Sequence, residues 1–198
     1  NGGTSAAITG ETLSGVVGSD DVSLSGTFAN KTVGNGKTVT FTLSGDDASN
    51  YSISGTTTAN ITAKTANITG TSAGNKSYDG ATSATVSAGS ITAGDIESGD
   101  TLNIASTSGE FSNGNVGNGK TVTVTYTLGG ADAANYTASG NVVTANIVAK
   151  GLTQSGGGAT NRVYNGGTSA AITGETLSGV VGSDDVSLSG TFADKAVG

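Results

Sequence analysis

Seven residues, KTVTFTL at positions 37–43, begin with a lysine and then alternate threonine with apolar side chains. In an extended chain the valine, phenylalanine and leucine point to one side, and the threonines point to the other. The related stretch at 120–128 continues the same alternation over nine residues. This period of two predicts β-strands with one buried face, and threonine suits the solvent face of a pleated sheet.

Shorter strands and frequent turns surround these two stretches. Further strands are predicted at 22–24, 51–53, 59–63, 102–104, 136–138 and 145–149, and around residue 68. Asn35-Gly36 and Asn118-Gly119 are predicted to be tight turns, because both residue types tolerate a positive φ. No window of eleven or more residues has a helical period, so the sequence predicts an all-β protein.

The sequence repeats itself. Residues 165–193 reproduce residues 1–29 without a change, and a diverged copy lies between them. The offset between matching blocks grows from 78 at Asn1/Asp79 to 86 at Thr58/Thr144. If the two near-identical copies are called A and the diverged copy B, their order is A, B, A. We expect a longer parent chain to alternate A and B, because alternation would limit domain swapping between identical neighbouring repeats.

Strand number and spacing favour tandem immunoglobulin-like antiparallel β-sandwiches, joined like beads on a string. The predicted boundaries are residues 1–64 for a first repeat truncated at its N-terminus, 65–150 for a complete second repeat, and 151–198 for a third truncated at its C-terminus. A β-solenoid would need a period near 20–30 residues, and none is visible.

Composition excludes several classes of function. The chain has no cysteine and no histidine, so disulfides, thiolate metal sites and the usual general base are missing. A net charge of −7 with eight scattered Lys/Arg opposes nucleic-acid binding. No apolar run is long enough to cross a bilayer. A catalytic domain also has no reason to carry a second copy of itself, so no enzyme activity is expected.

Four tyrosines are predicted to be structural. Tyr51 and Tyr136 each open a strand after an Asp-containing turn, which predicts a corner residue with its ring in the core and its hydroxyl bonded to backbone. Tyr78 and Tyr164 precede an Asp/Asn-Gly turn and are expected to anchor it.

Paired carboxylates raise the question of calcium. Asp20, Asp21, Asp46 and Asp47 offer oxygen ligands, which calcium prefers. The middle copy changes Asp46-Asp47 to Ala131-Asp132 and displaces the other pair to Asp100, and neighbouring residues on a strand point to opposite faces. Turn or surface carboxylates are therefore the favoured interpretation, with no cofactor.

Several blocks together resemble a known repeat family. They are Tyr78-Asp79-Gly80 and Tyr164-Asn165-Gly166 followed by TSA, the segment DDVSLSG at 20–26, the VGNGK block and the DAxNY block. Their combination resembles YDG-type repeats, related to MBG-type repeats, of large bacterial secreted filamentous-haemagglutinin-like adhesins. The resemblance covers the whole chain and implies β-sandwich stalk modules of an exported surface protein without catalytic activity.

The expected function is therefore a structural stalk or spacer that projects a distal binding region from a bacterial surface, with multivalent adhesion if each bead binds weakly. Its expected partners are neighbouring repeats and a host or matrix receptor. One alternative is a subunit of a self-assembling extracellular filament, sheath or surface layer. Another is a module that binds a glycan or protein directly.

Overall fold

The computed structural model describes residues 2–10 and 12–196. These residues form short strands, loops and three single-turn 3-10 helices, with no α-helix among them. The all-β prediction is confirmed. Within the described part of the chain, no helix is long and apolar enough to span a membrane.

The chain divides into two compact units. The first comprises Asn1–Ser72, Val86–Ser108 and Val124–Asn141, and the second comprises Ala73–Thr85, Gly109–Thr123 and Val142–Gly198. The division falls within the second predicted repeat. The predicted repeat boundaries at 64/65 and 150/151 stay predictions.

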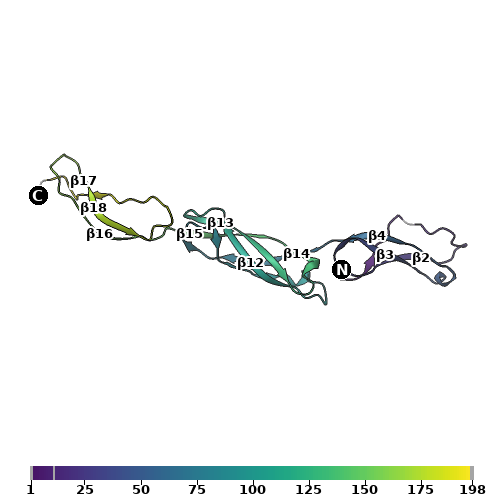
Figure 1. The fold of residues 1–198 in the computed structure, drawn as a ribbon. Coiled ribbons are helices and arrows are strands. Elements are labelled where there is room, and N and C mark those ends of the chain that lie inside the picture. Colours follow the sequence, from purple (N-terminus) through teal and green to yellow (C-terminus); the bar gives the residue numbers. More distant parts are fainter. Residues whose placement is uncertain (1, 11, 197–198) are drawn as a thin grey trace. The chain divides into compact units, whose positions relative to one another are not determined.

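The first unit contains an antiparallel sheet in the order β1-β2-β3-β4 (Figure 1). Its strands are β1 (Ser5–Ala6), β2 (Ser23–Phe28), β3 (Gly34–Ser44) and β4 (Thr56–Ile61). Two strand pairs accompany it, β5 (Lys64–Ala66) parallel to β14 (Tyr136–Ala138), and β6 (Ile68–Thr69) antiparallel to β11 (Ser90–Ile91). The 3-10 turns η1 (Ala48–Asn50), η2 (Ala93–Asp95) and η3 (Ala133–Asn135) also belong to this unit.

A five-stranded sheet has the order β8-β15-β13-β12-β9. Its strands are β8 (Lys76–Ser77), β9 (Ser83–Ala84), β12 (Asn103–Phe111), β13 (Gly117–Gly129) and β15 (Asn141–Val148). A short pair, β7 (Ser72–Ala73) and β10 (Val86–Ser87), lies in the same repeat. In the second unit β16 (Thr153–Ala159) pairs with β18 (Ile172–Ser178), and β17 (Ser169–Ala170) pairs with β19 (Gly190–Thr191).

One strand pairing recurs in all three copies. The register pairs Ser5 with Thr27, Ser83 with Glu110, and Ser169 with Thr191. In each copy the phenylalanine amide that follows donates to a threonine carbonyl: Phe28 to Thr4 at 2.7 Å, Phe111 to Thr82 at 2.7 Å and Phe192 to Thr168 at 2.8 Å. The repeats in the sequence are therefore repeats of local structure as well.

The alternating stretches form the two long strands that the sequence predicted. Residues 37–43 lie in β3 and 120–128 in β13, with Val39, Val122 and Val124 buried and the threonines exposed. The predicted strands at 22–24, 59–63, 102–104 and 145–149 overlap β2, β4, β12 and β15 with shifted bounds.

The buried side chains gather in the second repeat. Among the described residues the buried apolar set is Val39, Ala66, Ile68, Phe111, Val122, Val124, Tyr136, Ala145 and Ile147. All of them except Val39 lie between residues 66 and 147.

Two local predictions are wrong. Residues 51–53 form no strand, although their counterpart Tyr136–Ala138 is β14. β14 exists because it pairs with β5, and no counterpart of β5 is present beside 51–53 in the described residues. The dipeptides Asn35-Gly36 and Asn118-Gly119 do not join strands, because they lie inside β3 and β13.

The two dipeptides instead form bulges. Gly36 and Gly119 have φ of 59° and 58°, while no described residue other than glycine has a positive φ. The register of β3 against β4 shifts between Gly34 and Lys37. A glycine with positive φ that adds a residue to one strand is a β-bulge, which bends and twists the sheet locally.

Candidate functional site: the junctions between repeats

Each tyrosine that follows a 3-10 turn, Tyr51 after η1 and Tyr136 after η3, bonds to one loop of its own repeat. The Tyr136 hydroxyl donates to Asp100 Oδ2 at 2.8 Å and accepts from the Glu97 amide at 2.9 Å. Tyr51 makes the same bonds, to Asp20 Oδ2 at 2.7 Å and from the Val17 amide at 2.8 Å. Burial raises the pKa of Tyr136, whose ring is 6% exposed.

The backbone part of the tyrosine prediction is therefore confirmed, and the acid partner was missed. Asp20 and Asp100 each follow a short turn, in which their amides donate to Val17 and Glu97 carbonyls at 3.1 and 3.0 Å. In both loops the aspartate lies three residues after the residue that begins the turn. This spacing is the sequence signal that would have identified the aspartate partners of the two tyrosines. The ring of Tyr51 is only half-buried, so its place in a core is less complete.

The calcium candidates have other roles in the fold. Asp20 accepts from Tyr51, and Asp47 Oδ2 accepts from the Asp21 amide at 2.9 Å. Asp132 repeats the second bond, with the Thr101 amide at 2.9 Å. Asp46 is exposed. Among the described residues no group of three or more His, Cys, Asp or Glu could hold a metal ion.

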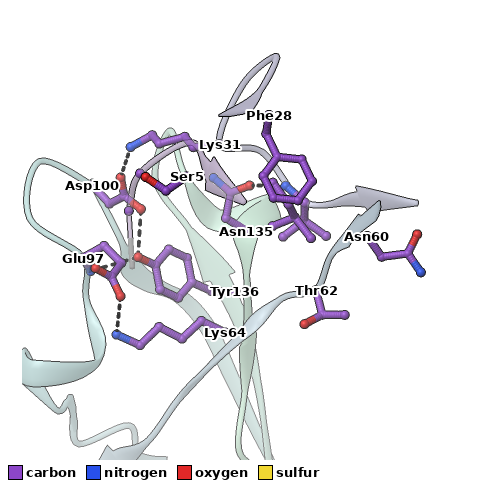
Figure 2. A pocket seen from close by; sticks show the side chains of 14 residues that line it. Ser5, Phe28, Lys31, Asn60, Thr62, Lys64, Glu97, Asp100, Asn135 and Tyr136 are labelled. Atoms are coloured by element: carbon purple, nitrogen blue, oxygen red, sulfur yellow. Dashed lines mark hydrogen bonds and ion pairs between the residues drawn. The ribbon is translucent and has the colours of Figure 1, made fainter. Parts of the chain in front are cut away.

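The first unit contains a junction at which the first and second repeats meet. Lys31, which follows β2, forms an ion pair with Asp100, so one carboxylate serves both Lys31 and Tyr136 (Figure 2). The Asp100 side chain is 5% exposed and that of Lys31 is 38% exposed. The Lys31 ammonium and then the Tyr136 hydroxyl hold the pKa of Asp100 below its ordinary value.

Three more contacts belong to this first junction. The Val33 amide donates to Asn135 Oδ1 at 3.0 Å, and Lys64 Nζ lies 2.8 Å from Glu97 Oε1. Lys64 is the main cause of a lowered pKa at Glu97. Gly2 lies against Glu97, because a β-carbon on Gly2 would be 3.3 Å from Glu97 Oε2.

These side chains line an open recess of about 280 Å³. Its charged groups are two lysines and two carboxylates, joined in pairs across it (Figure 2). Such paired charges neutralise each other. The arrangement is suited to holding two repeats together.

The second unit contains a junction of the same plan between the second and third repeats. A β-carbon on Gly80 would lie 3.3 Å from Val181 Cγ1. The Tyr78 hydroxyl lies beside Asp184, whose carboxylate is the main cause of the raised pKa of Tyr78. The Asp184 amide donates to the Val181 carbonyl at 3.0 Å, the same turn that Glu97 and Asp100 form.

The two junctions thus use matching positions. Gly2 corresponds to Gly80, Glu97 to Val181, and Asp100 to Asp184. In the third repeat the corresponding glycine, Gly166, has φ of 76° like Gly80, and a β-carbon there would meet nothing within 4 Å. The glycine of the motif therefore lies against the following repeat at both junctions.

The acid of the motif holds its own turn. Asp79 Oδ1 accepts from the Ala81 amide at 2.9 Å and from Lys76 Nζ at 2.7 Å. In the third repeat Asn165 Oδ1 accepts from the Gly167 amide at 3.1 Å and from Arg162 at 2.6 Å. Asparagine therefore replaces aspartate as the acceptor of the same turn.

The remaining predicted positions differ in burial. Tyr78 is half-buried, and its amide donates to the Val148 carbonyl at 2.8 Å, which is consistent with an anchor. Tyr164 is 59% exposed, and its role as an anchor stays a prediction.

The bulge glycines have a partner that was also missed. The Gly36 amide donates to Asn60 Oδ1 at 2.8 Å, and the Gly119 amide donates to Asn146 Oδ1 at 2.7 Å. Each bond joins the VGNGK block to the TANI block of the same repeat. The recurrence of both blocks at matching spacing was the available signal.

A chain of all-β repeats whose successive copies touch through matching loops is the class of protein that this geometry defines. The YDG domain model matches residues 1–59, 62–145 and 148–198. The chain therefore belongs to the YDG domain family. No curated protein and no solved structure matches it.

Proposed function

We propose that these repeats are stalk or spacer modules of a secreted or surface-exposed bacterial adhesin, of the filamentous-haemagglutinin-like kind. The observation that carries the proposal is the recurrence of one junction plan, in which Gly2 meets Glu97 and Gly80 meets Val181. Junctions with defined contacts transmit orientation from one repeat to the next, so each added repeat adds reach.

We further propose that each complete repeat is an immunoglobulin-like β-sandwich. In support, the pairing of β9 with β12 recurs as β1 with β2 and as β17 with β19. The buried residues of the second repeat come from several strands, as the core of a two-layered domain requires.

The proposal includes no catalysis and no cofactor. The partners are neighbouring repeats and a receptor bound by a distal region, and the location is extracellular, at the cell surface. The absence of cysteine suits a chain that must pass an oxidising compartment without forming cross-links.

Self-assembly into a filament or layer is the second candidate, and one feature favours it. The β1–β4 sheet has an exposed face rich in hydroxyl groups. One row across its four strands contains Ser5, Thr27, Thr40 and Thr56. A weakly charged face of this kind can pack against another sheet, and any adhesion by weakly binding beads would be multivalent.

Light scattering and small-angle X-ray scattering on residues 1–198 distinguish these candidates. The stalk proposal expects a monomer with the scattering of a rod, and a maximum dimension that grows in proportion to repeat number in longer arrays. A compact globule would overturn it, and filaments in negative stain would favour assembly. Antibody labelling of intact producing cells tests the location, and a glycan array tests direct binding.

A further inference from the structure

The two junctions have the same plan and different chemistry. Two positions carry the difference: Lys31 in the first repeat corresponds to Gly114 in the second, and Glu97 in the second corresponds to Val181 in the third. Each junction lies inside one compact unit, so its contacts can be compared position by position.

The first junction is electrostatic. The first repeat contributes Lys31, which forms an ion pair with Asp100 of the second. Lys64 begins β5 inside the second family match, and it pairs with Glu97 of the same match. The other carboxylate that acts on Lys31 is that of Asp132. A cation of one repeat therefore meets an anion of the next.

The second junction is mainly apolar. Val181 packs toward Gly80, and a recess of about 210 Å³ is lined by Val116, Leu152, Val180 and Val186 together with Tyr78, Lys150 and Asp184. A lysine cannot take the place of Gly114, because a β-carbon there would be 2.7 Å from the Gly80 carbonyl oxygen. The close approach of the motif turn thus excludes the cation that the first junction uses.

We infer that copies A and B have two unlike pairs of matching end surfaces. The A-to-B junction is held by an ion pair and the B-to-A junction by apolar contact. Added salt therefore loosens only every second junction of an alternating array. The inference rests on the proposed stalk function. It adds that each end of a repeat fits the end of the unlike repeat, A against B or B against A. It follows from screening, which weakens exposed ion pairs and leaves apolar contact intact.

Distances between spin labels test this on residues 1–198. The chain has no cysteine, so introduced cysteines are labelled cleanly. One pair, Thr42→Cys with Ser106→Cys, reports on the first junction, and another, Thr121→Cys with Thr176→Cys, reports on the second. All four positions are exposed, and each pair lies within one unit.

Raising NaCl from about 0.1 M to about 1 M shortens the Debye length from about 10 Å to about 3 Å. We expect the distance distribution of the first pair to broaden by about twofold, with little change in the second pair. Equal responses at both junctions, or no response at either, would overturn the inference while leaving a monomeric, rod-like chain consistent with the stalk. Filament formation would instead overturn the stalk proposal.

Two variants sharpen the test. Lys31→Gly should broaden the distance distribution of the first spin-label pair at low salt and abolish its response to salt, whereas Lys195→Gly should do neither. Lys195 occupies the position of Lys31 in the third repeat, so it is a matched control for the loss of one charge. A Lys195→Gly effect equal to that of Lys31→Gly would contradict the assignment.

Discussion

The Tyr136 hydroxyl donates to Asp100 at 2.8 Å, and the same carboxylate forms the ion pair with Lys31 of the preceding repeat. One acid therefore belongs both to the internal corner of a repeat and to the contact between repeats. Loss of order at the corner should pass directly to the junction.

Tyr136→Phe tests the corner. The variant keeps the buried ring and removes the hydroxyl, leaving the Glu97 amide without its acceptor, so we expect a loss of about 1 kcal/mol in the free energy of unfolding. Chemical denaturation measures it. Tyr164→Phe, at a ring that is 59% exposed, is the control and should change little. Equal changes in the free energy of unfolding in the two variants would show that the Tyr136 hydroxyl adds nothing to stability.

The first junction should depend on pH in a defined direction. The pKa values of Asp100 and Glu97 are lowered from 3.8 and 4.5, so their contribution is complete above those values and is lost as pH falls below them. The pKa values of Lys31 and Lys64 are raised from 10.5, so their contribution is lost only as pH rises above that value.

We therefore expect a plateau of junction order between about pH 5 and about pH 10, with losses on both sides. Carboxyl carbon NMR shifts of Asp100 and Glu97, followed from pH 7 downward, measure the acid side directly. Titration of Asp100 at or above 3.8 would contradict the ion pair as its main perturbation.

Gly119→Ala tests the bulge in β13. An alanine at φ of 58° is strained, and we expect a loss of about 1–2 kcal/mol in unfolding free energy. Gly151→Ala is the matched control, since Gly151 has no positive φ and a β-carbon there meets nothing within 4 Å. Thermal unfolding compares the two, and a neutral Gly119→Ala would refute the strained bulge.

Ile147 and Ile61 occupy the same position in two copies and differ in burial. Ile147 is 0% exposed, whereas Ile61 is only half-buried. Ile147→Ala should cost about 2–5 kcal/mol, and Ile61→Ala clearly less, because a smaller apolar area loses its contacts. Urea denaturation measures both. A larger loss of unfolding free energy in Ile61→Ala than in Ile147→Ala would place the core in the first repeat.

Much of the strand pattern could be predicted from the sequence, because alternation at 37–43 and 120–128 depends only on which face is buried. The bulges could not, since Asn-Gly also suits a hairpin turn and only the bond from Gly119 to Asn146 marks the difference. The junctions were missed because Gly2 and Glu97 lie far apart in sequence and carry no local signal of contact.

The β16 strand was missed as well. Its sequence, TQSGGGA, has no apolar alternation and contains three glycines, which are poor strand formers. It is a strand because β18 pairs with it from Thr153/Ser178 to Ala159/Ile172. Pairing with a neighbour decided its conformation against its own propensity.

By itself the sequence determined the repeats, the all-β class, the YDG family and the turn at each Asp/Asn-Gly, because these depend on residue identity and local spacing. Tertiary structure decided which segments became strands. Residues 172–178 form β18 through their pairing with β16. A strand satisfies its backbone hydrogen bonds only through a partner, so pairing decides which segments become strands.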